Sequence, residues 1–106
     1  MNNRTKHTNI PTKVKQRVWE RDNGECIFCH SPNAFPEAHI IPRSHNGRGI
    51  EENIVTVCRI CHGKMDNSSD RQFYLDAAKS YVRSIYPDWN EKMCTYDKWG
   101  FLNGKQ

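Results

Sequence analysis

Four of the five cysteines form two Cys-x2-Cys pairs, Cys26 with Cys29 and Cys58 with Cys61, and 28 residues separate the pairs. Each pair, which we call a knuckle, can supply two thiolates, so both can surround one tetrahedral ion at about 2.3 Å. Two disulfides are the alternative. The N-terminal residues resemble no signal peptide, and paired cysteines of an intracellular chain usually bind metal or do redox chemistry. The spacing therefore predicts a structural Zn²⁺ site.

Three further residues, His39, Asn53 and His62, lie inside this cysteine frame or directly after it. Histidine titrates near neutral pH, so it can accept a proton from a reacting group. The separation of the knuckles exceeds that of the commonest zinc-ribbon pattern, which indicates a subdomain between them. The metal that folds this subdomain would also position the histidines.

The length and composition favour a single small domain that needs additional stabilisation. A chain of 106 residues with 36% hydrophobic residues buries a modest fraction of its surface, and a structural metal would add the missing stability. The fifth cysteine, Cys94, is expected to be a half-buried helical residue. No segment reaches the ~20 apolar residues of a membrane span, and we expect a cytoplasmic protein.

Positive charge is concentrated at the front of the chain. Residues 1–21 carry six Lys or Arg against one acid, whereas the whole chain has a net charge of +4. Such a region suits contacts with the phosphate backbone of nucleic acid, although a solvated tail is an equal alternative. We expect residues 1–11 to be a disordered basic arm and residues 12–106 to form one domain, with a core at 26–67 and a C-terminal helical extension at 68–106.

The elements that must position these residues follow from periodicity. They are an amphipathic helix from Thr12 to just before Gly24, a short strand at Ala38 to Ile41, a loop at Pro42 to Asn53, a β-branched strand at Ile54 to Val57, a helix from Cys61, and a second amphipathic helix at Arg71 to Tyr86. The aromatic residues after it, among them Trp89, Trp99 and Phe101, are expected to pack back over the core. The fold class is α+β.

Three segments carry a resemblance to a known family. They are Glu37-Ala-His-Ile-Ile-Pro-Arg-Ser-His45, Glu52-Asn-Ile-Val-Thr-Val-Cys-Arg-Ile-Cys-His62 and Lys64-Met-Asp66. With them the chain resembles the HNH endonuclease family, also called ββα-metal or His-Me finger, in a small phage-type version with two knuckles. The resemblance implies a zinc-stapled ββα-metal core, flanking helices, and hydrolysis of phosphodiester bonds in duplex DNA with one catalytic divalent ion.

The resemblance also implies roles for individual residues. His39 would be the general base that takes a proton from water, Asn53 would hold the loop or orient His39, and His62 would bind the catalytic ion. Arg43 could contact a phosphate. Asp66, one helical turn after His62, could be a second ligand and would favour Mg²⁺ or Mn²⁺ over Ni²⁺ or Zn²⁺. Alternatively, Asp66 is a solvent-facing residue in a surface ion pair.

One position departs from the family pattern. Ala38 stands where many relatives place a metal-binding His or Asp before the base, so Glu37, His45, Asn53 or water would have to complete the coordination. The alternative function is a non-catalytic zinc-stapled module that binds nucleic acid. Phage packaging or genome-processing proteins are expected partners by family analogy, and the oligomeric state stays open.

Overall fold

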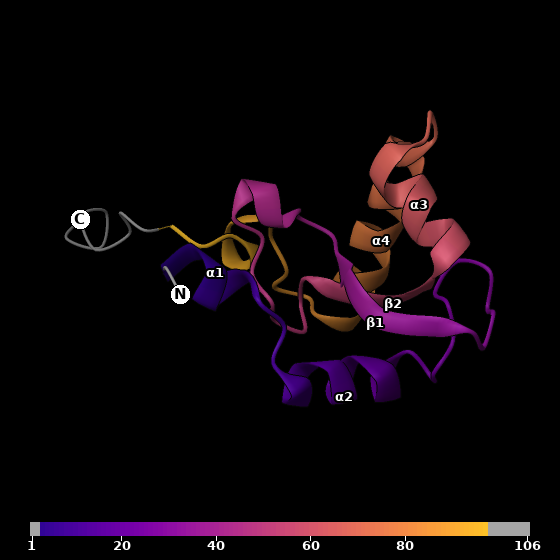
Figure 1. The fold of residues 1–106 in the computed structure, drawn as a ribbon, viewed down its shortest axis with the longest axis horizontal. Helices are drawn as coiled ribbons and strands as arrows, with labels where there is room; N and C mark the ends of the chain where they lie inside the picture. The colour runs from indigo at the N-terminus through magenta and orange to yellow at the C-terminus, as the bar shows by residue number, and fades with distance from the viewer. Residues whose placement is uncertain (1–2, 98–106) are drawn as a thin grey trace.

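The computed structural model describes residues 3–97, whose helices lie around a two-stranded sheet (Figure 1). No helix within this range is both long and apolar enough to cross a membrane. In chain order the elements are α1 (Asn3–Thr8), α2 (Thr12–Arg21), β1 (Ala34–His39), the 3-10 turn η1 (Arg43–His45), β2 (Ile54–Cys58), α3 (Arg59–Asn67), α4 (Arg71–Ile85) and the 3-10 turn η2 (Lys92–Cys94).

The sheet is an antiparallel pair in which Ala34 lies opposite Cys58 and His39 lies opposite Ile54. β1 begins four residues earlier and ends two residues earlier than the expected strand at Ala38 to Ile41. Pro36 is tolerated inside it because a two-stranded sheet leaves one edge of each strand free of ladder hydrogen bonds. The pairing places His39 at the end of β1, directly beside the start of β2.

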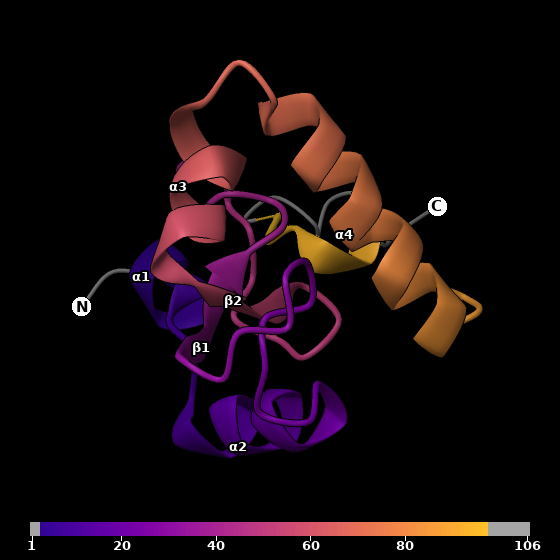
Figure 2. The ribbon, with the colours of Figure 1, turned by 90° about the vertical axis from the view of Figure 1, so that its right-hand side faces the viewer.

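The hairpin lies between α2 on one side and α3 with α4 on the other (Figure 2). Val14 and Val18 of α2 pack with Ile54 in a small apolar cluster, which explains the amphipathic pattern of that helix. The main core lies on the other side and includes Val55 from β2. It also includes Val57, Met65, Leu75, Ala78 and Val82. The result is the expected α+β fold, with α3 following β2 without a break.

The expectation of a disordered arm at residues 1–11 is wrong for the part that the structure describes. Residues 3–8 form helix α1, and the side chain of Thr8 is 2% exposed. The polar sequence gave no sign of this because α1 is held mainly by backbone groups and not by an apolar face. Its carbonyls at His7 and Thr8 accept hydrogen bonds from Gly49 and His39.

The C-terminal part returns to the core as expected over the described residues. The Trp89 side chain is 6% exposed, and its Nε1 donates to the Glu52 carbonyl at 2.7 Å. Cys94 lies in the 3-10 turn η2 and is fully buried, which corrects the expectation that it is half-buried. The expected packing of Trp99 and Phe101 lies outside the described residues.

Candidate active site

The four knuckle cysteines converge from three parts of the fold. Cys26 and Cys29 lie in the turn before β1, Cys58 ends β2, and Cys61 lies in the first turn of α3. Their sulfur atoms all lie within 4.8 Å of one another, and the Sγ atoms of Cys29 and Cys58 are 3.6 Å apart. Bonds of about 2.3 Å to a tetrahedral ion place ligand sulfurs about 3.8 Å apart. The cluster therefore fits a structural metal such as zinc, and all five cysteines are free of disulfides.

The knuckle backbone favours a thiolate at the centre of this cluster. Burial alone raises the pKa of Cys26, but N–H groups of Cys29, Cys58 and Phe28 outweigh it and lower the pKa to about 7. Burial and the neighbouring sulfurs raise the pKa of Cys61. Four thiols this close cannot all ionise without a cation, so metal binding and loss of their protons are coupled.

His39 is half-buried, and one of its ring nitrogens has a defined partner. Its Nε2 lies 2.9 Å from the Thr8 carbonyl oxygen. A carbonyl can only accept, so Nε2 carries the proton, and the neutral ring keeps its lone pair on Nδ1. Burial lowers the pKa of His39 below 6.5, the Thr8 hydrogen bond opposes this, and the charges of Arg43 and His62 lower it further. His39 is therefore a neutral imidazole at pH 7, and within residues 3–97 its Nδ1 has no hydrogen-bond partner.

Asn53 holds the loop that joins the two strands. Its side chain is fully buried, its Oδ1 accepts from the Ile41 N–H at 2.8 Å, and its Nδ2 donates to the carbonyls of Ile41 and Arg48 at 3.1 and 2.9 Å. Both ends of the amide are thus engaged within the protein. Asn53 braces residues 41–48 and has no free donor atom for an ion.

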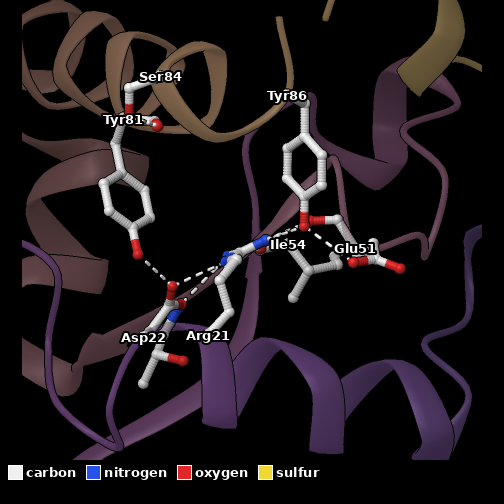
Figure 3. Close-up of polar contacts among 8 residues, drawn as sticks. Arg21, Asp22, Glu51, Ile54, Tyr81, Ser84 and Tyr86 are labelled. Carbon is white, nitrogen blue, oxygen red and sulfur yellow. Dashed lines mark hydrogen bonds and ion pairs between the residues drawn. The ribbon is translucent and has the colours of Figure 1, made fainter.

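A partly buried arginine, Arg21, fixes the turn that leads into β2 (Figure 3). Arg21 donates to the carbonyls of Glu51 and Ile54, each at 2.7 Å, and pairs with Asp22 at 2.8 Å. Burial lowers the pKa of Arg21, but hydrogen bonds to Asp22 and Tyr86 raise it above its ordinary value. The guanidinium stays charged and fastens the end of α2 to the turn at Glu51 to Ile54. This role was not predicted, because Arg21 contributed to the sequence reasoning only through the positive charge of residues 1–21.

His62 and Asp66 lie one turn apart on α3, with His62 Nε2 and Asp66 Oδ2 separated by 3.5 Å. The two side chains are 32% and 56% exposed, so both can reach a ligand from solvent. One divalent ion bound by a nitrogen and a carboxylate oxygen at about 2.0–2.2 Å needs donor atoms at about this separation. The separation fits two ligands of one divalent ion, and it equally fits a surface ion pair when His62 is protonated.

The other candidate ligands are placed differently. Ala38 is fully buried, and Glu37 lies 3.7 Å from Lys15 of α2 in a surface ion pair. His45 is exposed at the end of η1. Of the alternatives for the missing ligand, Asn53 is engaged and Glu37 is paired elsewhere, which leaves His45 or water.

Arg43 lies at the start of η1, exposed, and its guanidinium donates to Asn9 Oδ1 at 2.6 Å. Its charge reaches His39, because it contributes to the lowered pKa of that histidine. Arg43 therefore lies within electrostatic reach of His39. The contact with Asn9, like the one from Thr8, comes from the N-terminal segment, which sequence reasoning had left without structure.

Comparison with known families gives one match. Residues 26–76 match the model of a family described as HNH endonuclease. No curated protein and no solved structure matches the chain. The matched range includes both knuckles, the hairpin, His39, Asn53, α3 and the first part of α4, and so coincides with the stapled site. The segment that holds the cysteine cluster and His39 is therefore similar to the HNH endonuclease family.

Proposed function

We propose that this protein is a metal-dependent endonuclease that hydrolyses phosphodiester bonds of DNA, with His39 as general base. The observation that carries the proposal is the state of His39. It is neutral at pH 7, its Nε2 is occupied by the Thr8 carbonyl, and its Nδ1 is left to accept a proton. General-base catalysis of this kind contributes about 10²–10⁴-fold to rate.

The chemistry assigned to His39 balances in one step. Nδ1 takes a proton from a water molecule while the water oxygen attacks phosphorus, and the bond from phosphorus to the leaving oxygen breaks. The ring then carries both N–H groups and a positive charge. Its Nε2–H still donates to the Thr8 carbonyl, whose partial negative charge stabilises the imidazolium.

His62 and Asp66 would hold the divalent ion of the reaction. When bound, that ion polarises a phosphate oxygen and stabilises the charge on the leaving oxygen. The carboxylate of Asp66 favours Mg²⁺ or Mn²⁺, whereas the imidazole of His62 also suits Ni²⁺ or Zn²⁺. The 3.5 Å separation of the two donor atoms supports the assignment. Their side chains stay partly exposed, as a shared substrate and metal site requires.

DNA as substrate is supported by the cations around the site. Arg43 is exposed next to His39 and can contact a phosphate in place of Asn9. The basic face of α2 contributes less than its sequence suggests, because Lys15 pairs with Glu37 and Arg17 pairs with Glu51. Sequence-independent binding to the duplex backbone therefore rests on a few side chains, and we expect it to weaken steeply with salt.

The decisive experiment compares wild type with His39→Ala on supercoiled plasmid in Mg²⁺, Mn²⁺, Ni²⁺, Zn²⁺ and EDTA. Wild type should give metal-dependent nicked or linear product, and the variant should lose at least about 100-fold of the rate. His30→Ala is the matched control, because His30 is 73% exposed and lies on the first knuckle turn. Binding to plasmid without cleavage in any metal would instead identify a zinc-stapled binding module.

A further inference from the structure

The N-terminal segment, residues 3–10, docks directly on the reaction centre. Three successive residues of this segment each contact a different part of the site. The His7 carbonyl accepts from the Gly49 N–H at 3.0 Å, the Thr8 carbonyl accepts from His39 Nε2 at 2.9 Å, and Asn9 Oδ1 accepts from Arg43 at 2.6 Å. The N-terminal segment thus contacts His39, the loop residue Gly49 and Arg43. This segment lies before residues 26–76, which match the family model.

These contacts form at the C-terminal end of helix α1. The last carbonyls of a helix have no partner within it, and they carry its partial negative charge. At the end of α1, the carbonyls of His7 and Thr8 are satisfied by groups of the reaction centre instead of by water. The chain buries Thr8 to 2% exposure in the process. The docking is therefore built from backbone groups that any sequence would carry, which explains why composition did not reveal it.

Gly49 makes this close approach possible. A Cβ atom at Gly49 would lie 1.9 Å from the Asn9 carbonyl oxygen and 2.5 Å from its carbonyl carbon. Both obstacles are backbone atoms, so no rotation of a side chain could relieve the clash. Gly49 lies in the loop that Asn53 braces. The docking of the N-terminal segment therefore depends on the position of that loop.

A second contact joins α1 to the residues that follow η2. The ring of His7 stacks on Tyr96 with centroids 4.1 Å apart and an angle of 9° between the planes. The Tyr96 N–H donates to the Asn46 carbonyl at 2.7 Å, so the stacked pair is tied to the same loop. Figure 1 shows α1 beside the η2 region at one end of the molecule.

We propose that residues 3–10 are a positioning element of the reaction centre, with the Thr8 carbonyl orienting His39 and Asn9 orienting Arg43. Docked, the segment fixes the His39 ring so that Nδ1 faces the reacting water. Undocked, His39 loses its only hydrogen-bond partner among the described residues and turns freely. A misplacement of about 1 Å costs about 10²-fold in rate, so catalysis should require the docked state. The effect on catalysis rests on the proposed nuclease function, whereas the effect on the His39 ring does not.

The test uses full-length Gly49→Ala, which displaces the segment without altering a residue that touches substrate. In ¹⁵N-labelled protein, wild type should show the Nε2–H proton of His39 as a resonance protected from exchange by the Thr8 hydrogen bond. Gly49→Ala should lose that resonance, keep its bound zinc, and lose about 100-fold in kcat. Gly63→Ala is the matched control, because a Cβ at Gly63 meets no heavy atom within 4 Å. It should keep both the resonance and the activity.

Two further variants make each outcome informative. His7→Ala removes the stacking on Tyr96 without adding a clash, so it should weaken the resonance and kcat partially, and it decides the question if Gly49→Ala does not fold. Asn9→Ala should raise KM with little change in kcat. If wild type does not cleave DNA, the nuclease proposal fails and the resonance alone tests the positioning. A folded, zinc-bound Gly49→Ala that keeps the protected resonance or the wild-type kcat overturns the proposal.

Discussion

The cysteine cluster and the His39 environment lie at opposite ends of the two-stranded sheet, and they are held together in different ways. The four cysteine sulfurs are brought within 4.8 Å of one another by the turn before β1 and the junction between β2 and α3, both encoded by local spacing. His39 is oriented by a carbonyl 31 residues earlier in the chain, and its loop is braced by Asn53 and Arg21. A structural metal held by the four sulfurs would stabilise the first region. Backbone hydrogen bonds between distant segments define the second.

This difference separates stability from catalytic geometry. Loss of a knuckle ligand should remove the metal site that stabilises the whole domain, whereas loss of a contact around His39 should leave the domain folded with His39 displaced. The two regions should therefore respond to different perturbations, and the following substitutions test whether they do.

The largest effect should come from the zinc-knuckle cluster. Cys58→Ser removes a ligand at the junction of β2 and α3, and structural zinc in small domains contributes an apparent binding free energy of about 10–16 kcal/mol. We expect the variant to lose its zinc and its cooperative thermal transition, measured by metal analysis and circular dichroism. Cys94→Ser is the control, because Cys94 is equally buried but lies outside the cluster. A chelated wild-type protein that still melts cooperatively at the same temperature would contradict the structural role.

The next effect separates the two metal sites. His62→Ala should lower the rate of plasmid cleavage by about 100-fold or more, because metal assistance supplies several kcal/mol of transition-state stabilisation. It should leave the zinc content unchanged, since His62 lies outside the cysteine cluster. Lys64→Ala, on the same helix and also exposed, should cleave like wild type. Equal cleavage by all three proteins would show that His62 binds no catalytic ion.

The same contrast explains which features the sequence revealed. The knuckles, the strand β2 and helices α2 and α4 were predictable within a few residues, because cysteine spacing, β-branched runs and apolar periodicity are local signals. The candidate pair His62 and Asp66 followed from helical spacing, and their side chains do lie 3.5 Å apart. Local sequence signals were therefore sufficient to predict the knuckles, the strand β2 and helices α2 and α4.

The sequence could not reveal contacts made by generic backbone groups. Thr8 acts through its carbonyl, which every residue possesses, and its neighbours are polar, so residues 1–11 read as a disordered arm. Arg21 counted only toward the positive charge of residues 1–21, yet it donates hydrogen bonds to the carbonyls of Glu51 and Ile54. One signal was available, namely Gly49, because a glycine in a loop can mark a close backbone approach. It could not say which segment approaches.

A moderate effect should follow from Asn53→Ala. The substitution leaves the Ile41 N–H and two carbonyls without partners in a buried position, which should lower the free energy of unfolding by about 2–4 kcal/mol. Urea denaturation of zinc-bound protein measures this. Asn33→Ala, at an exposed site on the first knuckle side of β1, should change stability by less than about 0.5 kcal/mol. Matching stabilities for the two variants would mean that Asn53 does not brace the loop.

The smallest effect is the pH dependence of the His39 environment, and its sign is fixed by the direction of the pKa shift. Burial holds the pKa of folded His39 below its unfolded value of about 6.5, so the unfolded state binds more protons between the two values. The contribution of His39 to stability is therefore complete above about pH 6.5 and is lost as the pH falls through the lower, folded value. The cleavage rate should fall over the same acidic range, because the base must be neutral. His39→Gln should remove this part of the stability profile, and Gly49→Ala, which exposes the ring, should move the midpoint toward 6.5. A midpoint above 6.5 in wild type would show that the Thr8 carbonyl and not burial dominates, and it would make the bond to α1 the stronger of the two influences on the base.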